Sequence, residues 1–166
     1  MDIDMSHKTN SYLSFSIGNE IYGAHVNHVI HISEMTRITK VPKAPEYMRG
    51  VLNLRGSVLP VLDARIKFGN KNILDTSNTC ILVLEVSARN ESFRLGVIVD
   101  SVKEVIEIDP EEIKPAPAVG NEYMADIITG IVFKNEHFIL MLDVLKLFAD
   151  ESMIERRYTE AEAEKI

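Results

Sequence analysis

Apolar and polar residues alternate over short stretches through most of this chain. Residues 12–17 read Tyr-Leu-Ser-Phe-Ser-Ile, which is the period of a strand with one buried face. Residues 80–86 form the most continuously apolar stretch, and residues 93–99 are expected to pair back against it. Turn-forming residues separate these stretches at short intervals. The pattern therefore predicts a mainly β chain of short strands, as in small closed barrels.

Other segments carry less regular patterns. Strands are expected over residues 21–26 and 36–41, the start of a one-turn helix over residues 109–112, and a loop or turn over residues 121–126. Apolar residues within 29–32 fit both a helical turn and a bent strand, and their periodicity does not decide between the two.

The clearest local signal is the stretch Gly50 to Phe68, which reads GVLNLRGSVLPVLDARIKF. Two apolar runs flank a polar turn at residues 53–57, and Gly56 can adopt the positive φ that a tight reversal needs. We interpret this stretch as a β-hairpin. Asp63 then occupies the position of a helix N-cap, and one helical turn follows that ends at Gly69.

A second copy of this stretch lies 80 residues later, at Gly130 to Phe148, and it matches Asp63 with Asp143. The segments that precede the two copies correspond at an offset of 73 residues, so that residues 23–26 match residues 96–99. An internal repeat indicates a duplicated supersecondary unit, and this one predicts two similar small barrels. The alternative is a chance likeness between two units of hairpin and helix.

The two hairpin turns differ in a way that points to function. The first turn presents Arg55 beside Gly56, where the bare backbone lets another chain come close, whereas residues 133–136 form an ordinary polar tip. Arginine suits a protein contact because its guanidinium forks to carboxylates and stacks on apolar surface. The alternative for Arg55 is an intramolecular salt bridge that holds the turn.

Composition narrows the class of protein. The chain has 166 residues, of which 46% are hydrophobic, and a formal net charge of −7, which argues against a nucleic-acid binder. No apolar run reaches the roughly 18 residues that a membrane span needs, and the polar, acidic first ten residues are no secretory signal. The single cysteine, Cys80, lies in an apolar run and indicates a buried thiol in a reducing compartment. We therefore expect a cytoplasmic protein.

Short motifs in both halves of the chain form a recognisable set. The first half contains Gly50-Val-Leu-Asn-Leu-Arg-Gly56, Val58-Leu-Pro-Val-Leu-Asp63 and the upstream Ile38-Thr-Lys-Val-Pro-Lys-Ala-Pro45. The second half contains Gly96-Val-Ile-Val-Asp-Ser-Val102, Ile113-Lys-Pro-Ala-Pro117 and Gly130-Ile131. Together these motifs resemble the CheW family, the chemotaxis coupling proteins whose domain also forms the regulatory end of the chemotaxis histidine kinase. The similarity covers nearly the whole chain, from Ser11 to Ala149.

This resemblance implies a mainly β fold of two SH3-like five-stranded β-barrels with intertwined strands, and short helices after the hairpins and at the C-terminus. We expect a CheW-like domain over residues 11–149, with pseudo-repeated barrels at about 11–70 and 79–149 that exchange strands. Residues 1–10 are expected to be a disordered tail, and residues 150–166 a charged helix or tail.

The resemblance also implies a function without catalysis and without a cofactor. Such a protein bridges the cytoplasmic tips of methyl-accepting chemoreceptors to the regulatory domain of the histidine kinase, and copies of it can associate in arrays. One barrel would bind the kinase, and a groove between the barrels would bind the receptor. The family pattern places partner contacts at five residues of this chain: Val29, His31, Asn53, Arg55 and Gly56. Family members commonly have a glutamate where this chain has His31, so partner preference at that contact is open.

Catalytic and metal-binding alternatives find little support in the residues. Asp63 and Asp143 could form a carboxylate pair, but a helix cap explains both. His25, His28 and His31 recur every three residues without an obvious fourth metal ligand, and an apolar strand would raise the pKa of Cys80. No nucleophile elbow and no Gly-rich phosphate loop occurs.

Three functions of different kinds therefore remain open from the sequence. The favoured one is a non-catalytic adaptor between chemoreceptors and the chemotaxis kinase. The second is a CheW-like module of another chemosensory pathway, serving motility or a second messenger. The third is a small β-barrel enzyme or metal-binding protein.

Overall fold

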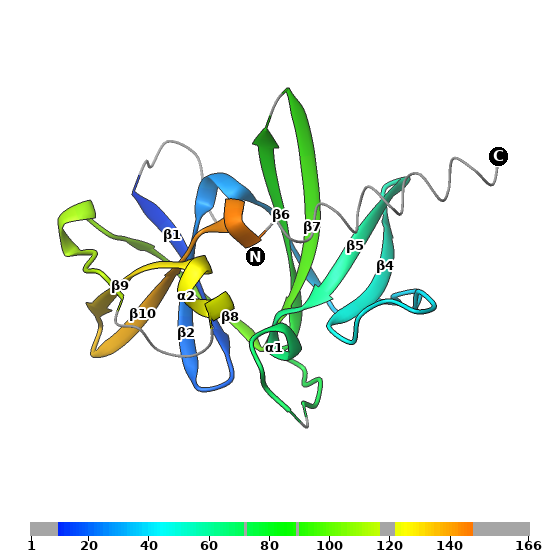
Figure 1. The fold of residues 1–166 in the computed structure, drawn as a ribbon, viewed down its shortest axis with the longest axis horizontal. Helices are drawn as coiled ribbons and strands as arrows, with labels where there is room; N and C mark the ends of the chain where they lie inside the picture. Colours follow the sequence, from blue (N-terminus) through cyan, green and yellow to red (C-terminus); the bar gives the residue numbers. More distant parts are fainter. Residues whose placement is uncertain (1–9, 72, 89, 117–121, 148–166) are drawn as a thin grey trace.

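A computed structural model describes residues 10–71, 73–88, 90–116 and 122–147 of the chain. In this part of the chain, ten strands form two five-stranded sheets (Figure 1). We call them sheet A, in the order β8-β1-β2-β10-β9, and sheet B, in the order β3-β6-β7-β5-β4. The prediction of a mainly β fold built from two five-stranded units is confirmed.

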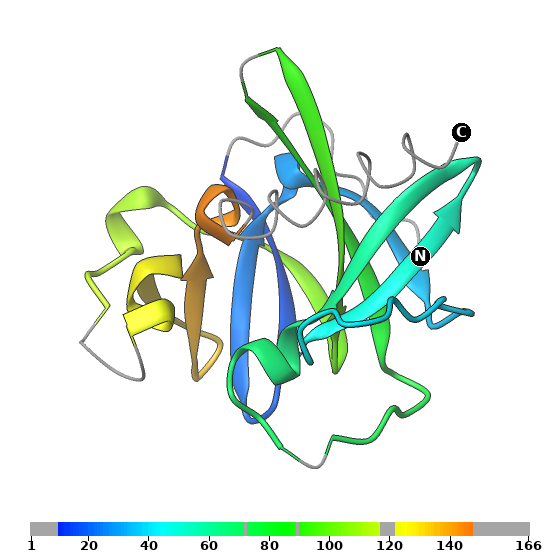
Figure 2. The ribbon, with the colours of Figure 1, turned by 45° about the vertical axis from the view of Figure 1, so that its right-hand side comes forward.

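The strands of sheet A come from both ends of the chain. They are β1 (Ser11–Ile17), β2 (Glu20–His25), β8 (Ser101–Glu107), β9 (Ile128–Lys134) and β10 (His137–Leu142). Those of sheet B come from its middle: β3 (Val29–Glu34), β4 (Met48–Leu54), β5 (Ser57–Asp63), β6 (Cys80–Ala88) and β7 (Glu91–Val99). The two sheets lie side by side, and the far end of the long β6–β7 hairpin projects beyond the other strands of both sheets (Figures 1 and 2).

The described helical segments are short. They are η1 (Val26–His28), α1 (Ala64–Lys67), η2 (Pro110–Glu112), α2 (Glu122–Ile127) and a turn over residues 144–147. As predicted, Asp63 caps α1, because its side chain accepts a hydrogen bond from the backbone N–H of Arg65. Asp143 does the same for the turn that follows β10, through the N–H of Lys146. No helix among the described residues is long and apolar enough to cross a membrane.

The sequence repeat appears in how the strands are ordered. Strands β1 to β5 correspond to β6 to β10, and this substitution converts the order of sheet A into that of sheet B. Among the described strands, each sheet has a single parallel pair, which joins the two repeats: Val61 lies opposite Gly96 and Met141 lies opposite Gly23. Each sheet therefore contains strands from both repeats, so that neither half of the chain builds a sheet by itself.

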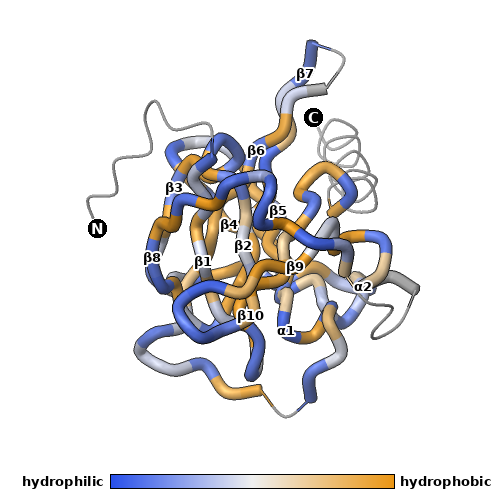
Figure 3. Tube along the Cα trace, turned by 90° about the vertical axis from the view of Figure 1, so that its left-hand side faces the viewer, coloured by the Kyte–Doolittle hydropathy of each residue, from blue (hydrophilic) through white to orange (hydrophobic). Residues whose placement is uncertain are grey.

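Three apolar clusters hold the described part of the molecule together. One lies inside sheet B, around Val61 and Ile81, and one inside sheet A, around Ile139 and Met141. The largest cluster, which we call the junction core, contains buried residues of both sheets, among them Phe15 and Leu82. Strand β6 serves two clusters because its side chains alternate in direction, which explains its continuous apolar sequence. Hydrophobic segments fill the middle of the chain trace, and the tip of the β6–β7 hairpin is hydrophilic (Figure 3).

Two sequence predictions about local structure are wrong, and a third is resolved. Residues 36–41 form no strand, because the segment pairs with the β4–β5 hairpin at one position only, an isolated β-bridge between Thr39 and Val51. Helix α2 replaces most of the loop expected at residues 121–126, since six residues are too few to show a helical period. The ambiguous stretch near Val29 contains both alternatives, a 3-10 turn over Val26–His28 and then strand β3. The expectations for residues 1–9 and 150–166 lie outside the described residues.

Candidate partner-docking site

The turn of the β4–β5 hairpin carries three of the five predicted contact residues. Arg55 and Gly56 connect the paired residues Leu54 and Ser57, and both have positive φ, 52° and 85°. Such a two-residue turn with left-handed backbone matches the twist of the strands that it joins. The Asn53 side chain accepts a hydrogen bond from the backbone N–H of Gly56, at 3.0 Å. Asn53 and Gly56 thus shape the turn, and the turn directs Arg55 into solvent.

Arg55 and His31 line the same depression on sheet B. Its volume is about 350 Å³, and its walls come from β3, the β4–β5 hairpin and β7: Ile30, His31, Leu54, Arg55, Ser57 and Arg94. The structure thus brings together two of the predicted contact residues from distant parts of the chain. Val29 lies elsewhere, because its side chain is 4% exposed and belongs to the junction core.

The depression is cationic. Arg94 donates to Glu85 across the β6–β7 pair, with 2.7 Å between Nε and Oε2, and its side chain is half exposed. The side chain of Arg55 makes no hydrogen bond or ion pair with any other residue that the structure describes, so an intramolecular salt bridge does not account for it there. No carboxylate is among the lining residues that the structure describes. This surface can offer guanidinium groups to an acidic group of another molecule.

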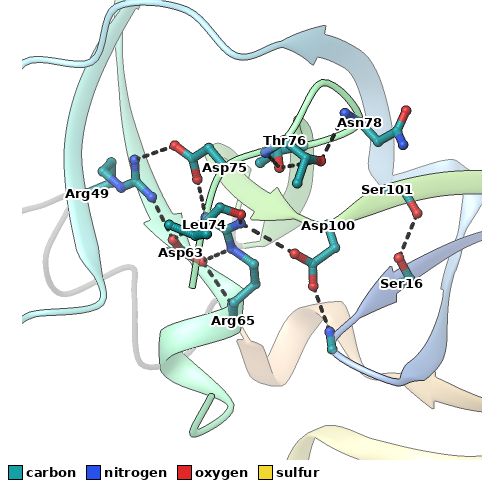
Figure 4. A network of polar contacts seen from close by, with 12 residues as sticks. Ser16, Arg49, Asp63, Arg65, Leu74, Asp75, Thr76, Asn78, Asp100 and Ser101 are labelled. Atoms are coloured by element: carbon teal, nitrogen blue, oxygen red, sulfur yellow. Dashed lines mark hydrogen bonds and ion pairs between the residues drawn. The ribbon is translucent and has the colours of Figure 1, made fainter. Parts of the chain in front are cut away.

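A second polar centre, which the sequence did not predict, lies at the start of α1 (Figure 4). Arg65 is 1% exposed, and its guanidinium makes two bonds of 2.9 Å to the buried carboxylate of Asp63. It also contacts Asp75, at 2.6 Å, and Asp100, at 3.4 Å. Arg49 reaches Asp63 and Asp75 from the other side. We call these five residues the Arg65 network.

The Arg65 network keeps its carboxyl groups charged. Burial alone would raise the pKa of Asp63, but hydrogen bonds and charge from Arg65 and Arg49 outweigh burial and lower that pKa. Hydrogen bonds from the same two arginines lower the pKa of Asp75. Asp63 is thus a structural anion whose carboxylate oxygens are paired with arginines. A catalytic acid or base would instead need a carboxyl oxygen that can exchange a proton with a substrate. The sequence signal was the Asp-x-Arg spacing at the start of α1, which the second repeat lacks at Asp143.

The histidines and Cys80, the other candidate metal ligands or nucleophiles, do not form a common site in the described residues. His28 contacts the backbone carbonyl of Glu85 through Nδ1, at 3.1 Å, and His25 packs edge-on against Tyr12. No three potential metal ligands come together in the described ranges. Burial raises the pKa of the Cys80 thiol against a smaller opposing effect of a backbone hydrogen bond from Val102, as expected for an unreactive cysteine.

Comparison with known proteins assigns the family. The sequence matches the CheW-like domain over residues 11–152, which is most of the chain. This chain belongs to the CheW-like domain family. The chain is 32% identical over 142 residues to the chemotaxis protein CheW of Klebsiella aerogenes, and this alignment covers 86% of this chain and 83% of the relative. It is 28% identical over 141 residues to the chemotaxis protein CheW of Treponema pallidum, covering 85% and 83%.

A solved structure supports the same assignment for the fold of this CheW-like domain. The crystal structure of the scaffolding protein TtCheW from Thermoanaerobacter tengcongensis matches with a TM-score of 0.72 and 30% identity. The match covers 82% of this chain and 90% of that one. The resemblance seen in the motifs around Gly50–Asp63 is therefore confirmed, together with the fold that it implied. These similarities support a role as a chemotaxis scaffold.

Proposed function

We propose that this CheW-like chain is a non-catalytic scaffold that couples chemoreceptors to the chemotaxis histidine kinase. The observation that carries the proposal is the family match over residues 11–152, together with a structural relative that is itself a scaffolding protein. The chemistry of the described residues is in keeping with this role, because the buried charged groups of the Arg65 network are all paired with one another.

In this proposal the two partners use different parts of the molecule. The depression around Arg55 lies within sheet B alone, and we assign it to the regulatory domain of the kinase. The receptor tip would bind between the two sheets. Val29, whose buried side chain belongs to the junction core, would act through the shape of that region. Contacts between copies of the chain would extend such a complex into an array.

The test is a pull-down of the purified chain with two probes, a chemotaxis kinase regulatory domain and the cytoplasmic signalling tip of a methyl-accepting receptor. Each probe is offered alone and then both together. We expect each probe to bind alone and all three components to be recovered in one complex by size-exclusion chromatography. If the chain fails to bind one or both of the probes, the proposal is contradicted, and a CheW-like module of another chemosensory pathway is favoured.

A further inference from the structure

We infer that the depression on sheet B recognises an acidic segment of the kinase regulatory domain, in which a carboxylate lies next to an apolar side chain. The inference rests on the proposed function and names the chemistry of that contact. Arg55 and Arg94 would bind the carboxylate, and the apolar walls formed by Ile30 and Leu54 would cover the neighbouring side chain. Ile30 is suited to this because 39% of it is exposed although it is a large apolar residue.

The internal repeat supplies a comparison within the same molecule. Sheet A has a depression of about 430 Å³ at the equivalent place, lined among others by Lys103, Glu104, Lys134 and Asn135. By the offsets of the repeat, Glu104 corresponds to His31 and Asn135 corresponds to Arg55. Asn135 donates to Glu104 across that depression, at 3.4 Å, so the side chains at these two positions of sheet A pair with each other.

In sheet B the same two positions hold His31 and Arg55, whose side chains form no hydrogen bond or ion pair with each other. His31 replaces the acidic residue and Arg55 replaces the amide, so the site gains a cation and loses its internal acceptor. The chain as a whole is acidic, with a net charge of −7, yet none of the described residues that line this depression carries a carboxylate. A local cationic surface on an acidic protein selects an acidic partner, because like charges elsewhere repel that partner from the wrong faces.

The backbone at Arg55 supports the same conclusion. Its φ of 52° lies in the left-handed region, where arginine is less favourable than asparagine or glycine. The equivalent Asn135 has a φ of 54°, so the second hairpin meets the same requirement with a more suitable residue. Arginine therefore occupies the first turn against the local backbone preference, and such backbone strain is found most often where a residue has a functional contact to make.

The experiment is calorimetric titration of the full chain with the kinase regulatory domain, over salt concentrations from about 50 to about 500 mM. We expect Arg55→Ala to weaken binding about tenfold and Arg55→Glu to weaken it further, since a truncated interface anchor costs more than about 1 kcal/mol. Arg55→Asn should weaken binding as much as Arg55→Ala while keeping the hairpin geometry. The double variant Arg55→Ala with Arg94→Gln should also lose most of the salt dependence.

Matched controls separate this contact from the general effect of charge. Lys103→Ala removes one positive charge at the sheet A position equivalent to Ile30, and Asn135→Ala truncates the equivalent of Arg55; both should change affinity by less than about twofold. If the wild-type chain binds but the arginine variants bind equally well with the same salt dependence, the inference is overturned and the proposed function stands. An equal loss in Lys103→Ala would also overturn it. If the wild-type chain does not bind the kinase domain, the proposed function fails and the inference fails with it.

Discussion

Arg65 illustrates how a charged residue can be part of the core. It is the largest of the described side chains that are less than 2% exposed, and burial of an unpaired guanidinium would cost several kcal/mol. Its fork of donors faces Asp63, Asp75 and Asp100, and Asp100 in turn accepts from the backbone N–H of Gly18 in the β1–β2 turn, at 2.7 Å. One side chain therefore ties α1, the loop before β6 and the β1–β2 turn together.

We expect Arg65→Ala to lower the free energy of unfolding by about 3–5 kcal/mol, because it leaves the buried Asp63 carboxylate without its main partner. Urea denaturation followed by circular dichroism measures this loss. Arg65→Lys should recover only part of it, since an ammonium group cannot make the paired contact of a guanidinium. A loss below about 1 kcal/mol would show that Arg49 alone satisfies Asp63.

The same network makes stability depend on pH in a defined direction. The lowered pKa values of Asp63 and Asp75 lie below the value of about 3.9 expected for an unfolded chain. Their contribution is therefore fully present above about pH 4 and is lost as the pH falls through the folded-state values. Urea titrations at a series of acidic pH values should show a smaller loss in Arg65→Ala than in the wild type. Equal losses would mean that other carboxylates dominate acid unfolding.

At this scale the sequence predicted Asp63 correctly as a helix cap but did not predict its pairing with arginine. The cap is a local signal, because acceptor and donor are two residues apart. The partners of Arg65 at positions 75 and 100 come close only through the packing of the sheets. The depression around Arg55 is a similar case, since Arg94 enters it from β7 and no spacing in the sequence indicates that contact.

Among the elements, the two repeated hairpins are positioned by the same backbone contacts. Val51 exchanges two hydrogen bonds with Thr39, and Ile131 exchanges two with Lys114. The glycine before each of these residues leaves room for the segment that crosses the hairpin. A Cβ on Gly50 would lie 2.1 Å from the carbonyl oxygen of Thr39, and one on Gly130 would lie 2.8 Å from that of Lys114. These glycines are needed for close approach of the backbone.

We expect Gly50→Ala to destabilise the fold by about 2 kcal/mol or more, because the added methyl group overlaps backbone that cannot rotate away. Its φ of 149° adds strain for any residue with a Cβ. Thermal denaturation compares it with Gly56→Ala, where an added Cβ would meet no atom of the described residues within 4 Å. That substitution should cost only about 1–2 kcal/mol, for its positive φ. Equal shifts of the two melting temperatures would contradict the role assigned to the contact with Thr39.

Elements with strong local signals were predicted well. Both hairpins combine apolar runs with turn residues, and both are present with the expected caps. The strand predicted for residues 36–41 is absent although their β-branched residues favour one. A strand also needs a neighbouring strand along its length, and this segment has a single bridge. Helix α2 was missed because it is six residues long and its end is fixed by packing: the carbonyl of Ile127 accepts from Asp143, at 2.7 Å.

For the molecule as a whole, the exchange of strands between repeats decides how the two sheets depend on each other. Sheet A cannot form until the chain has passed through sheet B and returned, since β1 and β2 pair with β8 and β10. The repeat was readable from the sequence because it preserves local patterns, but strand partners were not, because contacts between residues far apart leave no periodic trace. The junction core then joins the sheets through a shared apolar cluster.

We expect Leu82→Ala to destabilise both sheets together, by about 2–5 kcal/mol, because Leu82 is 0% exposed and lies in the junction core. Hydrogen exchange should show the same loss of protection for the slowest amides of β2 and of β7, since neither sheet is complete without strands of both repeats. Leu74→Ala, at a residue that is 80% exposed, should change stability by less than about 0.5 kcal/mol. Loss of protection in sheet B with sheet A unchanged would contradict this coupling and would mean that the sheets unfold as separate units.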